Sequence, residues 1–297
     1  MQTQAGMRAR LCAATLALTL LAFAFAAEAQ DARALRARHA ALRVQLSDNP
    51  FGRPLVVESS ESSGEQKGAI YAVIEQPFKR VLSALRNSSE WCEVLILQAN
   101  VKNCEASSRG AEALAIFVAR KPTDSPGQAY RVAFGYEALA ADADYLHVAL
   151  NAPEGPLGTT DYRILLEATP LDASRTFLHL AYSYTLRSSA RMGMNMYLAT
   201  SGRDKVGFSI ANRTPVGEPV YVGGVRGVVE RNTMRYYLAL EACLSTLDAP
   251  AAERVERRLR AFHAGLERYP KQLHELELAE YLEIKRRDVA RVLQARQ

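Results

Sequence analysis

The stretch Gly68-Ala-Ile-Tyr-Ala-Val-Ile-Glu-Gln-Pro-Phe-Lys-Arg-Val-Leu-Ser-Ala-Leu85 decides how this chain folds. Its first half is rich in β-branched and aromatic residues, which predicts a strand over 68–75. Pro77 then begins a helix, because a proline at the first helical position lacks only an N–H that would have no partner there. The apolar side chains that follow are spaced to form one helical stripe, namely Phe78, Val81, Leu82 and Leu85. The chain therefore passes from a strand directly into an amphipathic helix.

The flanking segments extend this pattern in both directions. Residues 31–46 carry leucines at helical spacing and predict a short amphipathic helix, and 54–58 predicts a strand. The polar stretch 59–67 predicts the turn that leads into the next strand. Further on, Asn87-Ser-Ser predicts the cap of a second short helix, which contains Trp91.

The middle of the chain reads as short strands separated by turn residues. Apolar and polar side chains alternate along them: Val132 and Phe134 share one face, for example, and Arg131 lies on the other. Such alternation predicts an antiparallel sheet with one apolar face and one wetter face. The predicted strands cover 98–106, 111–120, 129–137, 144–151, 160–169 and 174–187.

Helices dominate the rest of the chain. Residues 188–200 predict a helix with three methionines, and the segment 202–224 is punctuated by glycine and proline. Gly224 begins a long helix that runs to about residue 247. Residues 250–297 predict charged amphipathic helices that are broken at Pro270.

This order of elements resembles the START-like superfamily, also called the helix-grip fold. The resemblance rests on 68–85, on Ser89-Glu-Trp-Cys92 and on the helix Arg226-Gly-Val-Val-Glu-Arg-Asn-Thr-Met-Arg-Tyr-Tyr-Leu-Ala-Leu240. It covers about 54–247 and implies an α+β fold in which a curved antiparallel sheet wraps a long helix. Members bind sterols, phospholipids, polyketides and plant hormones, and a minority are enzymes.

The expected organisation has four parts. A signal peptide over 1–29 precedes a helix and linker over 30–53, and the START-like domain over 54–247 precedes a helical extension over 248–297. Because a curved sheet and one helix leave space between them, we expect a pocket for an apolar small molecule or lipid. Methionine side chains would form a wall that can repack around different ligands, because they are unbranched. Tyrosine side chains would offer hydroxyls to a ligand with one polar end. The predicted lining residues are Ile116, Val118, Phe134, Tyr136, Ile164, Leu166, Tyr182, Tyr184, Met192, Met196 and Tyr236, and for each of them simple core packing is the alternative.

The N-terminus predicts export. Arg8 and Arg10 precede an apolar run from Leu11 to Ala27, and Ala27-Glu28-Ala29 has the small residues that signal peptidase requires. Cleavage after Ala29 and a periplasmic location follow, in an exported bacterial branch of the superfamily. Removing Arg8, Arg10 and Glu28 from 37 basic and 32 acidic residues leaves 35 and 31. This small and scattered excess gives little support to nucleic-acid binding.

Three cysteines remain after cleavage. Cys92 and Cys104 enclose a short segment and are predicted to form a disulfide in an oxidising compartment, and Cys243 is predicted to be a buried thiol. A metal site is the rival explanation, but the five histidines are scattered along the chain. We therefore expect no metal site and no cofactor.

The sequence contains no recognisable catalytic motif. Gly-x-Ser-x-Gly and phosphate-binding loops are absent, and His147 and His179 fall on the wetter strand faces, where exposed or hydrogen-bonded histidines are common. An enzyme of the cyclase or hydratase type remains an alternative, with Asp161 or Arg187 facing the pocket.

Two surface segments leave further alternatives open. The loop at 202–207 is charged and would form a portal rim, a partner site or, as we favour, a solvated turn. Lys285-Arg-Arg could contact anionic headgroups, although the acidic residues around it favour an ordinary solvated face. The third functional alternative is a structural envelope protein whose tail, 250–297, pairs with a partner or with itself, and the oligomeric state stays open.

Overall fold

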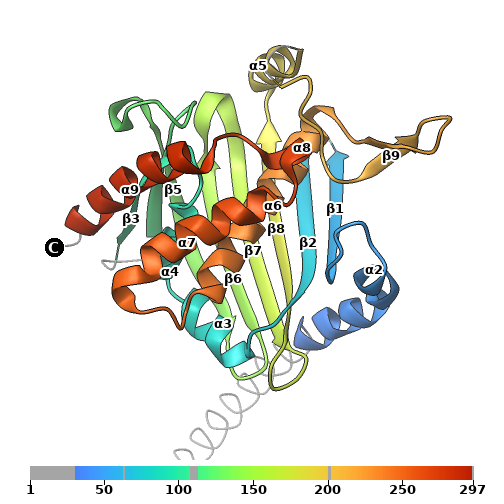
Figure 1. The fold of residues 1–297 in the computed structure, drawn as a ribbon, viewed down its shortest axis with the longest axis vertical. Helices are drawn as coiled ribbons and strands as arrows, with labels where there is room; N and C mark the ends of the chain where they lie inside the picture. Colours follow the sequence, from blue (N-terminus) through green and yellow to red (C-terminus); the bar gives the residue numbers. More distant parts are fainter. Residues whose placement is uncertain (1–30, 63, 108–112, 200–201, 296–297) are drawn as a thin grey trace, which may run out of the picture.

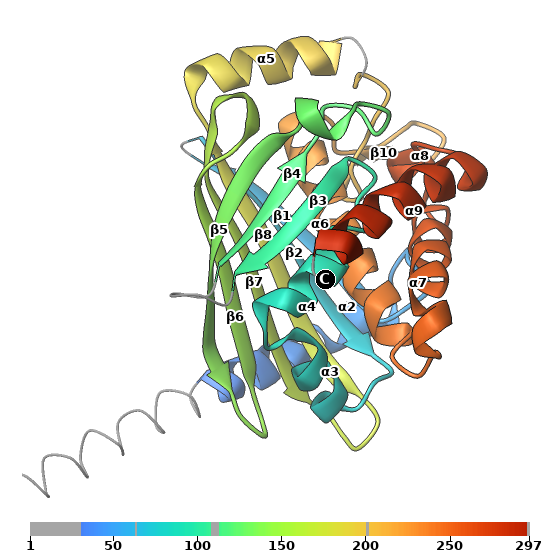
Figure 2. The same ribbon diagram turned by 90° about the vertical axis from the view of Figure 1, so that its left-hand side faces the viewer.

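The computed structural model describes residues 31–62, 64–107, 113–199 and 202–295. These residues form an antiparallel sheet of eight strands in the order β1-β2-β8-β7-β6-β5-β4-β3, with helices across one face (Figure 1). The strands curve around those helices (Figure 2), so the predicted α+β helix-grip fold is confirmed. The strands are β1 (Leu55–Ser62), β2 (Glu65–Ile74), β3 (Val101–Ser107), β4 (Ala113–Val118), β5 (Tyr130–Ala141), β6 (Leu146–Glu154), β7 (Thr159–Pro170) and β8 (Thr176–Leu186).

The first hairpin is longer than the sequence predicts. Most of the polar stretch 59–67, expected to be a turn, belongs to β1 and β2, which pair as far as Ser62 opposite Glu65. The prediction was wrong because the exposed end of a hairpin needs main-chain pairing but no apolar side chains. The chain passes from strand to helix as expected, into α3 (Phe78–Leu85), but Pro77 is the extended N-cap residue of that helix and not its first helical residue.

The long helix α6 (Gly224–Ser245) lies against β1, β2 and β8 on the concave face. Its first residue, Gly224, has a φ of +62°, which a residue with a side chain rarely adopts. Gly68 on β2 allows close approach, because a Cβ there would lie 2.3 Å from the Thr233 Oγ1. The position of α6 against the sheet therefore depends on two glycines, Gly224 at the start of the helix and Gly68 on the strand beneath its centre.

A disulfide between Cys92 and Cys104 joins α4 (Ser88–Leu95) to β3, with a Cα–Cα distance of 5.4 Å. The predicted pairing is thus confirmed. Cys243 is a buried free thiol, as predicted, and burial raises its pKa to about 12. The Trp91 indole N–H donates to the Leu85 carbonyl at 2.9 Å and ties α4 to α3.

The C-terminal helices pack on their own chain. They are α7 (Ala251–Leu266), α8 (Pro270–Leu273) and α9 (Leu278–Ala295); α7 lies on α6, and α9 lies on α7 and β3. Leu259, Phe262 and Tyr281 are buried in the same core as the sheet. The apolar stripes of the tail therefore pack within the chain.

The basic run of α9 corrects a second expectation. Lys285 was expected on a solvated or membrane-facing surface, but it is fully buried and its Nζ donates to the Val101 carbonyl and to Asp288 at 2.5 and 3.0 Å. Only Arg286 and Arg287 of the run are exposed. Helical periodicity explains the error, because position 285 shares a face with the buried Tyr281.

The convex face of the sheet carries an N-terminal helix. Residues 31–41 are helical and lead into α2 (Arg43–Ser47), and Leu35, Leu42 and Leu46 pack with Phe177. The predicted signal peptide, 1–29, lies outside the described residues. Among the residues that are described, no helix combines the length and apolarity needed to cross a bilayer.

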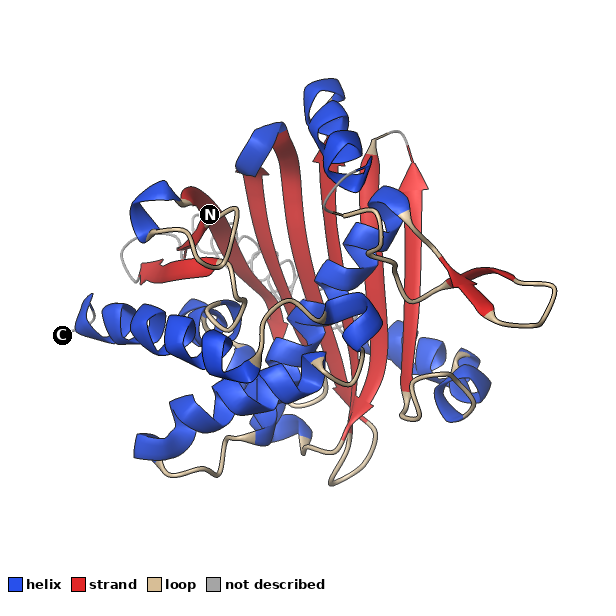
Figure 3. Ribbon diagram, turned by 45° about the horizontal axis from the view of Figure 1, so that its top comes forward, coloured by secondary structure: helices blue, strands red, loops and turns tan. Residues whose placement is uncertain are grey.

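The segment before α6 contains elements that the sequence did not predict. After α5 (Ser188–Ala199), β9 (Ile210–Arg213) and β10 (Pro219–Tyr221) form a hairpin that projects beyond the β1 edge (Figure 3). Glu230 of α6 fastens the chain ahead of this hairpin, since its Oε2 accepts the N–H groups of Phe208 and Ser209 at 2.6 and 2.9 Å. Two short 3-10 turns, η1 (Pro126–Gln128) and η2 (Pro156–Gly158), complete the fold.

Candidate ligand-binding pocket

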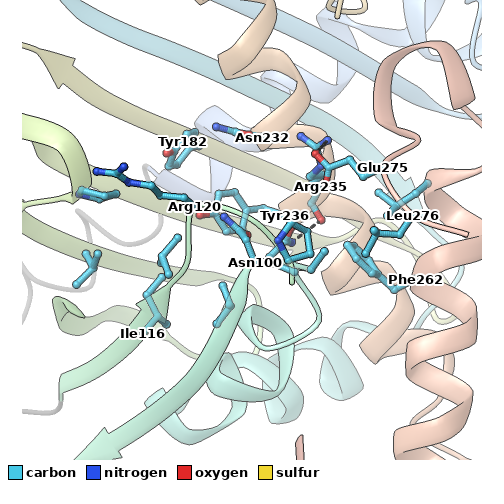
Figure 4. A pocket seen from close by; sticks show the side chains of 18 of the residues that line it. Asn100, Ile116, Arg120, Tyr182, Asn232, Arg235, Tyr236, Phe262, Glu275 and Leu276 are labelled. Carbon is cyan, nitrogen blue, oxygen red and sulfur yellow. Dashed lines mark hydrogen bonds and ion pairs between the residues drawn. The ribbon is translucent and has the colours of Figure 1, made fainter. Parts of the chain in front are cut away.

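A cavity of about 620 Å³ lies between the concave face of the sheet, α6 and the C-terminal helices (Figure 4). Small-molecule sites in proteins fall mostly between about 300 and 1,000 Å³. The lining residues come from 98–101 after α4, from strands β4, β5, β7 and β8, from the helix α6, and from the tail between Phe262 and Leu276. Four further residues from connecting segments complete the lining: Arg120, Pro122, Pro156 and Lys205.

Two apolar walls face each other across the cavity. Ile116 and Val118 of β4 and Val132 and Phe134 of β5 form one wall, because the alternate residues of both strands point to the concave face. The tail supplies the other wall with Phe262, Leu266 and Leu276. An apolar body is therefore removed from water on both sides.

A group of tyrosines stands between these walls and α6. Tyr182 packs on Tyr236 with ring centroids 5.1 Å apart and on Tyr162 at 6.0 Å. Burial raises the pKa of Tyr182 and of Tyr236, so both phenols stay neutral at physiological pH. The Tyr162 hydroxyl pairs with that of Thr159 at 2.8 Å. The group offers uncharged hydroxyls between the two apolar walls.

Charged side chains gather at the mouth of the pocket. Arg235 forms an ion pair with Glu275 at 2.6 Å, and Lys205 Nζ donates to the His274 carbonyl at 2.7 Å. Arg120, on the β4 side, donates to the Tyr130 hydroxyl at 2.8 Å. Figure 4 shows Arg235, Glu275 and Asn232 on the side of the cavity formed by α6 and the tail.

The predicted lining residues divide into two groups. Ile116, Val118, Phe134, Tyr182 and Tyr236 line the cavity. Ile164, Leu166, Tyr136 and Tyr184 are buried in the core cluster, and the Tyr136 hydroxyl donates to the Leu85 carbonyl at 3.3 Å. These four share the concave face with the lining residues but are packed under other side chains.

The two predicted methionines do not line this pocket. Met192 and Met196 are 71 % and 68 % exposed on α5, while the partly buried Met194 packs against the core. The expectation was wrong because residues at i and i+4 share a helix face, and the other face of α5 is the one turned to the protein. A pliable methionine wall is therefore absent from the described pocket.

Sequence reasoning missed the tail residues, the segment 98–101 and Lys205. The apolar stripe through Phe262 signalled a buried face, but not which cavity that face closes. The charged loop 202–207, favoured as a solvated turn, places the half-buried Lys205 at the mouth, which matches the portal-rim alternative. Asp161 and Arg187 are exposed and are not among the lining residues.

The histidines on the strands lie on the opposite, convex face. His179 Nδ1 is 2.6 Å from Glu167 Oε2, and the Tyr145 hydroxyl donates to the other oxygen of Glu167. Burial alone would raise the pKa of Glu167, but the hydrogen bonds from His179 and Tyr145 outweigh it and lower that pKa. In the described part of the chain, no group of three or more His, Cys, Asp or Glu residues could hold a metal ion.

Comparison with known proteins gives only distant likenesses. No protein-family model and no curated protein match the chain. Norcoclaurine synthase from Thalictrum flavum is similar over 50% of this chain and 80% of its own, at 13% identity and a TM-score of 0.33. The aromatase/cyclase ZhuI from Streptomyces sp. R1128 matches 47% of this chain and 86% of its own, at 15% identity and a TM-score of 0.32.

A conserved protein from Geobacillus kaustophilus matches 46% of this chain and 86% of its own, at 13% identity and a TM-score of 0.31. Likenesses of this size support no statement about activity. The helix-grip architecture rests instead on the strand order and on the packing of α6 against β1, β2 and β8.

Proposed function

We propose that the protein binds an apolar or lipid-like small molecule in the cavity between the sheet, α6 and the tail. The observation that carries the proposal is the cavity itself: about 620 Å³, with apolar walls on two sides and with tyrosines, amides and charged side chains making up the rest of the lining. In small-molecule sites, apolar walls hold the body of the ligand and placed polar groups orient it.

Binding is favoured over catalysis by the state of the ionisable groups. Arg235 pairs with Glu275, Lys205 with the His274 carbonyl, and His274 Nδ1 with Glu267 at 2.9 Å. A general acid or base needs a group held toward a reacting atom, whereas these groups are engaged by carboxylates or a backbone carbonyl of the protein itself. The role proposed is therefore that of a carrier or sensor.

The proposed location is the periplasm. The support is the leader-like N-terminus, with Arg8 and Arg10 before an apolar run and small residues at Ala27 and Ala29. The disulfide between Cys92 and Cys104 suits an oxidising compartment. In that compartment an apolar molecule must cross water between two membranes, and a protein with an apolar-walled pocket serves that purpose.

Two measurements test the binding function. Protein purified from the periplasm is extracted with organic solvent and the extract is analysed by mass spectrometry, and the stripped protein is titrated with the apolar fluorophore N-phenyl-1-naphthylamine. Val118→Trp should fill the pocket and weaken fluorophore binding at least tenfold. Val216→Trp, at a position 82 % exposed on the β9–β10 turn, is the matched control and should bind normally.

The proposal fails if the extract holds no co-purified molecule and the fluorophore does not bind. It also fails if Val118→Trp, folded as judged by circular dichroism, binds as tightly as the wild type, because the fluorophore would then sit elsewhere.

A further inference from the structure

The mouth of the pocket carries more positive than negative charge. Among the residues that line the cavity, Arg120, Lys205 and Arg235 are cationic, and Glu275 is the carboxylate. Glu275 is engaged by Arg235 at 2.6 Å, so it neutralises one of these cations. The positive charge that remains, on Arg120 and Lys205, belongs to the same lining as the two apolar walls.

Arg235 has donor capacity that the protein does not use. A guanidinium has five N–H donors. One terminal nitrogen bonds Glu275, while the Nε is buried and has no hydrogen-bond partner in the described part of the chain. The side chain is only 13 % exposed, so water reaches it poorly. The backbone of Arg235 is held in place, since its carbonyl accepts the Gln98 Nε2 at 3.1 Å.

Lys205 is the second underused donor. Its ammonium is half-buried and makes a hydrogen bond to the His274 carbonyl, which leaves two of its three N–H donors. Burial lowers the pKa of Lys205, and the nearby Arg235 and Arg231 lower it further, although Glu275 opposes the shift. A cation in this position is destabilised by its surroundings and would be stabilised by an added anion.

We propose that the pocket takes an amphipathic anion, whose carboxylate or phosphate group binds Lys205 and Arg235 while its apolar body lies between the β4–β5 wall and the tail. This inference rests on the proposed function and adds the chemical class of the ligand. A wholly apolar ligand would cover the mouth and leave these donors without partners, which is unfavourable for buried polar groups. An anion supplies charge-assisted hydrogen bonds, the stronger kind.

The test compares probes with the same apolar body and different ends. Dodecanoate, dodecyl phosphate and dodecanol are titrated by isothermal calorimetry at pH 7.5, and acetate and inorganic phosphate serve as head-group controls. We expect at least one of the two anions to bind ten times more tightly than dodecanol. The preferred anion distinguishes a carboxylate from a phosphate source, and acetate and inorganic phosphate should not bind measurably.

Substitutions of Lys205 test whether the preference for an anion arises at the mouth of the pocket. Lys205→Met should remove most of the preference for the anion, measured as the ratio of anion to dodecanol affinity, and Lys205→Arg should keep that ratio. Lys79→Met, at an exposed position of α3, is the matched control and should change neither affinity. Lys205→Glu should reverse the preference in favour of dodecylammonium.

The outcomes separate the two proposals. Equal binding of anion and alcohol by the wild type overturns this inference and leaves the proposed pocket function in place. A preference for anions that survives Lys205→Met and Lys205→Glu overturns it as well. Failure of all three twelve-carbon probes and of the apolar fluorophore overturns both proposals.

Discussion

Replacing Gly68 with alanine is expected to force α6 away from the sheet. The new Cβ would lie 2.3 Å from the Thr233 Oγ1 and 3.2 Å from both the Thr233 Cβ and the Val229 carbonyl oxygen. The strand cannot yield easily, because Gly68 pairs with Tyr182 in the interior of the sheet. Thr233 is fully buried and its hydroxyl donates to the Val229 carbonyl at 2.7 Å, so it cannot turn away without losing that bond.

The expected loss in the free energy of unfolding is about 2–3 kcal/mol, the upper part of the range for added methyl groups in a packed core. Thr233→Ala alone should cost about 1 kcal/mol for the small space it leaves. In the double variant the 2.3 Å contact disappears and the closest remaining approaches are 3.2 Å. The double variant should therefore be more stable than the sum of the single losses by about 1–2 kcal/mol.

Urea denaturation followed by circular dichroism measures these differences, provided that the m-value stays constant. Gly193→Ala is the control, because a Cβ at that helical position meets no atom within 4 Å. The reasoning is refuted if Gly68→Ala is as stable as the wild type, or if the losses in the double variant simply add.

Three further predictions concern the parts of the fold that hold the pocket. Replacing Cys92 and Cys104 with serine should lower stability by about 3 kcal/mol, and equal midpoints in urea for the variant and the oxidised wild type would contradict this. Burial lowers the pKa of Lys285 from 10.5 to about 8. Between pH 8 and 10.5 the Lys285 amine is therefore protonated in the unfolded chain but neutral in the folded protein. The free energy of unfolding should rise with pH over this range, by up to about 3 kcal/mol. Lys285→Met should remove that rise. Identical profiles of stability against pH for the variant and the wild type would show that Lys285 is not its cause. Glu230→Gln should speed amide hydrogen exchange at Phe208 and Ser209, whose N–H groups Glu230 accepts, while exchange in β7 stays unchanged; unaltered exchange at both amides would show that another group holds this segment.

Features set by neighbouring residues could be predicted from the sequence. Alternation placed Ile116 and Phe134 on the concave face, and Pro77 marked the passage from strand to helix, because both depend only on local geometry. The pairing of Cys92 with Cys104 could be predicted for the same reason, since the two cysteines are separated by only a short segment.

Features set by distant packing could not be predicted in this way. The stripe through Phe262 indicated burial, but the surface it meets depends on how α7 crosses α6. Lys285 looked like a surface residue because a run of basic side chains usually is one, and its burial follows from the docking of α9 on β3. The charged mouth joins residues 205, 235 and 275, which no local pattern connects.

The tail has a consequence for how ligand preference is encoded. The sheet and α6 provide one half of the cavity, and Phe262, Leu266 and Leu276, which follow α6 in the chain, provide the facing wall. Exchange of the C-terminal segment between related proteins would thus change the shape of the binding chamber without altering a single strand. A chimera spliced after α6 would therefore change the shape of the cavity and keep Lys205 and Arg235, the two residues proposed to bind an anionic head group.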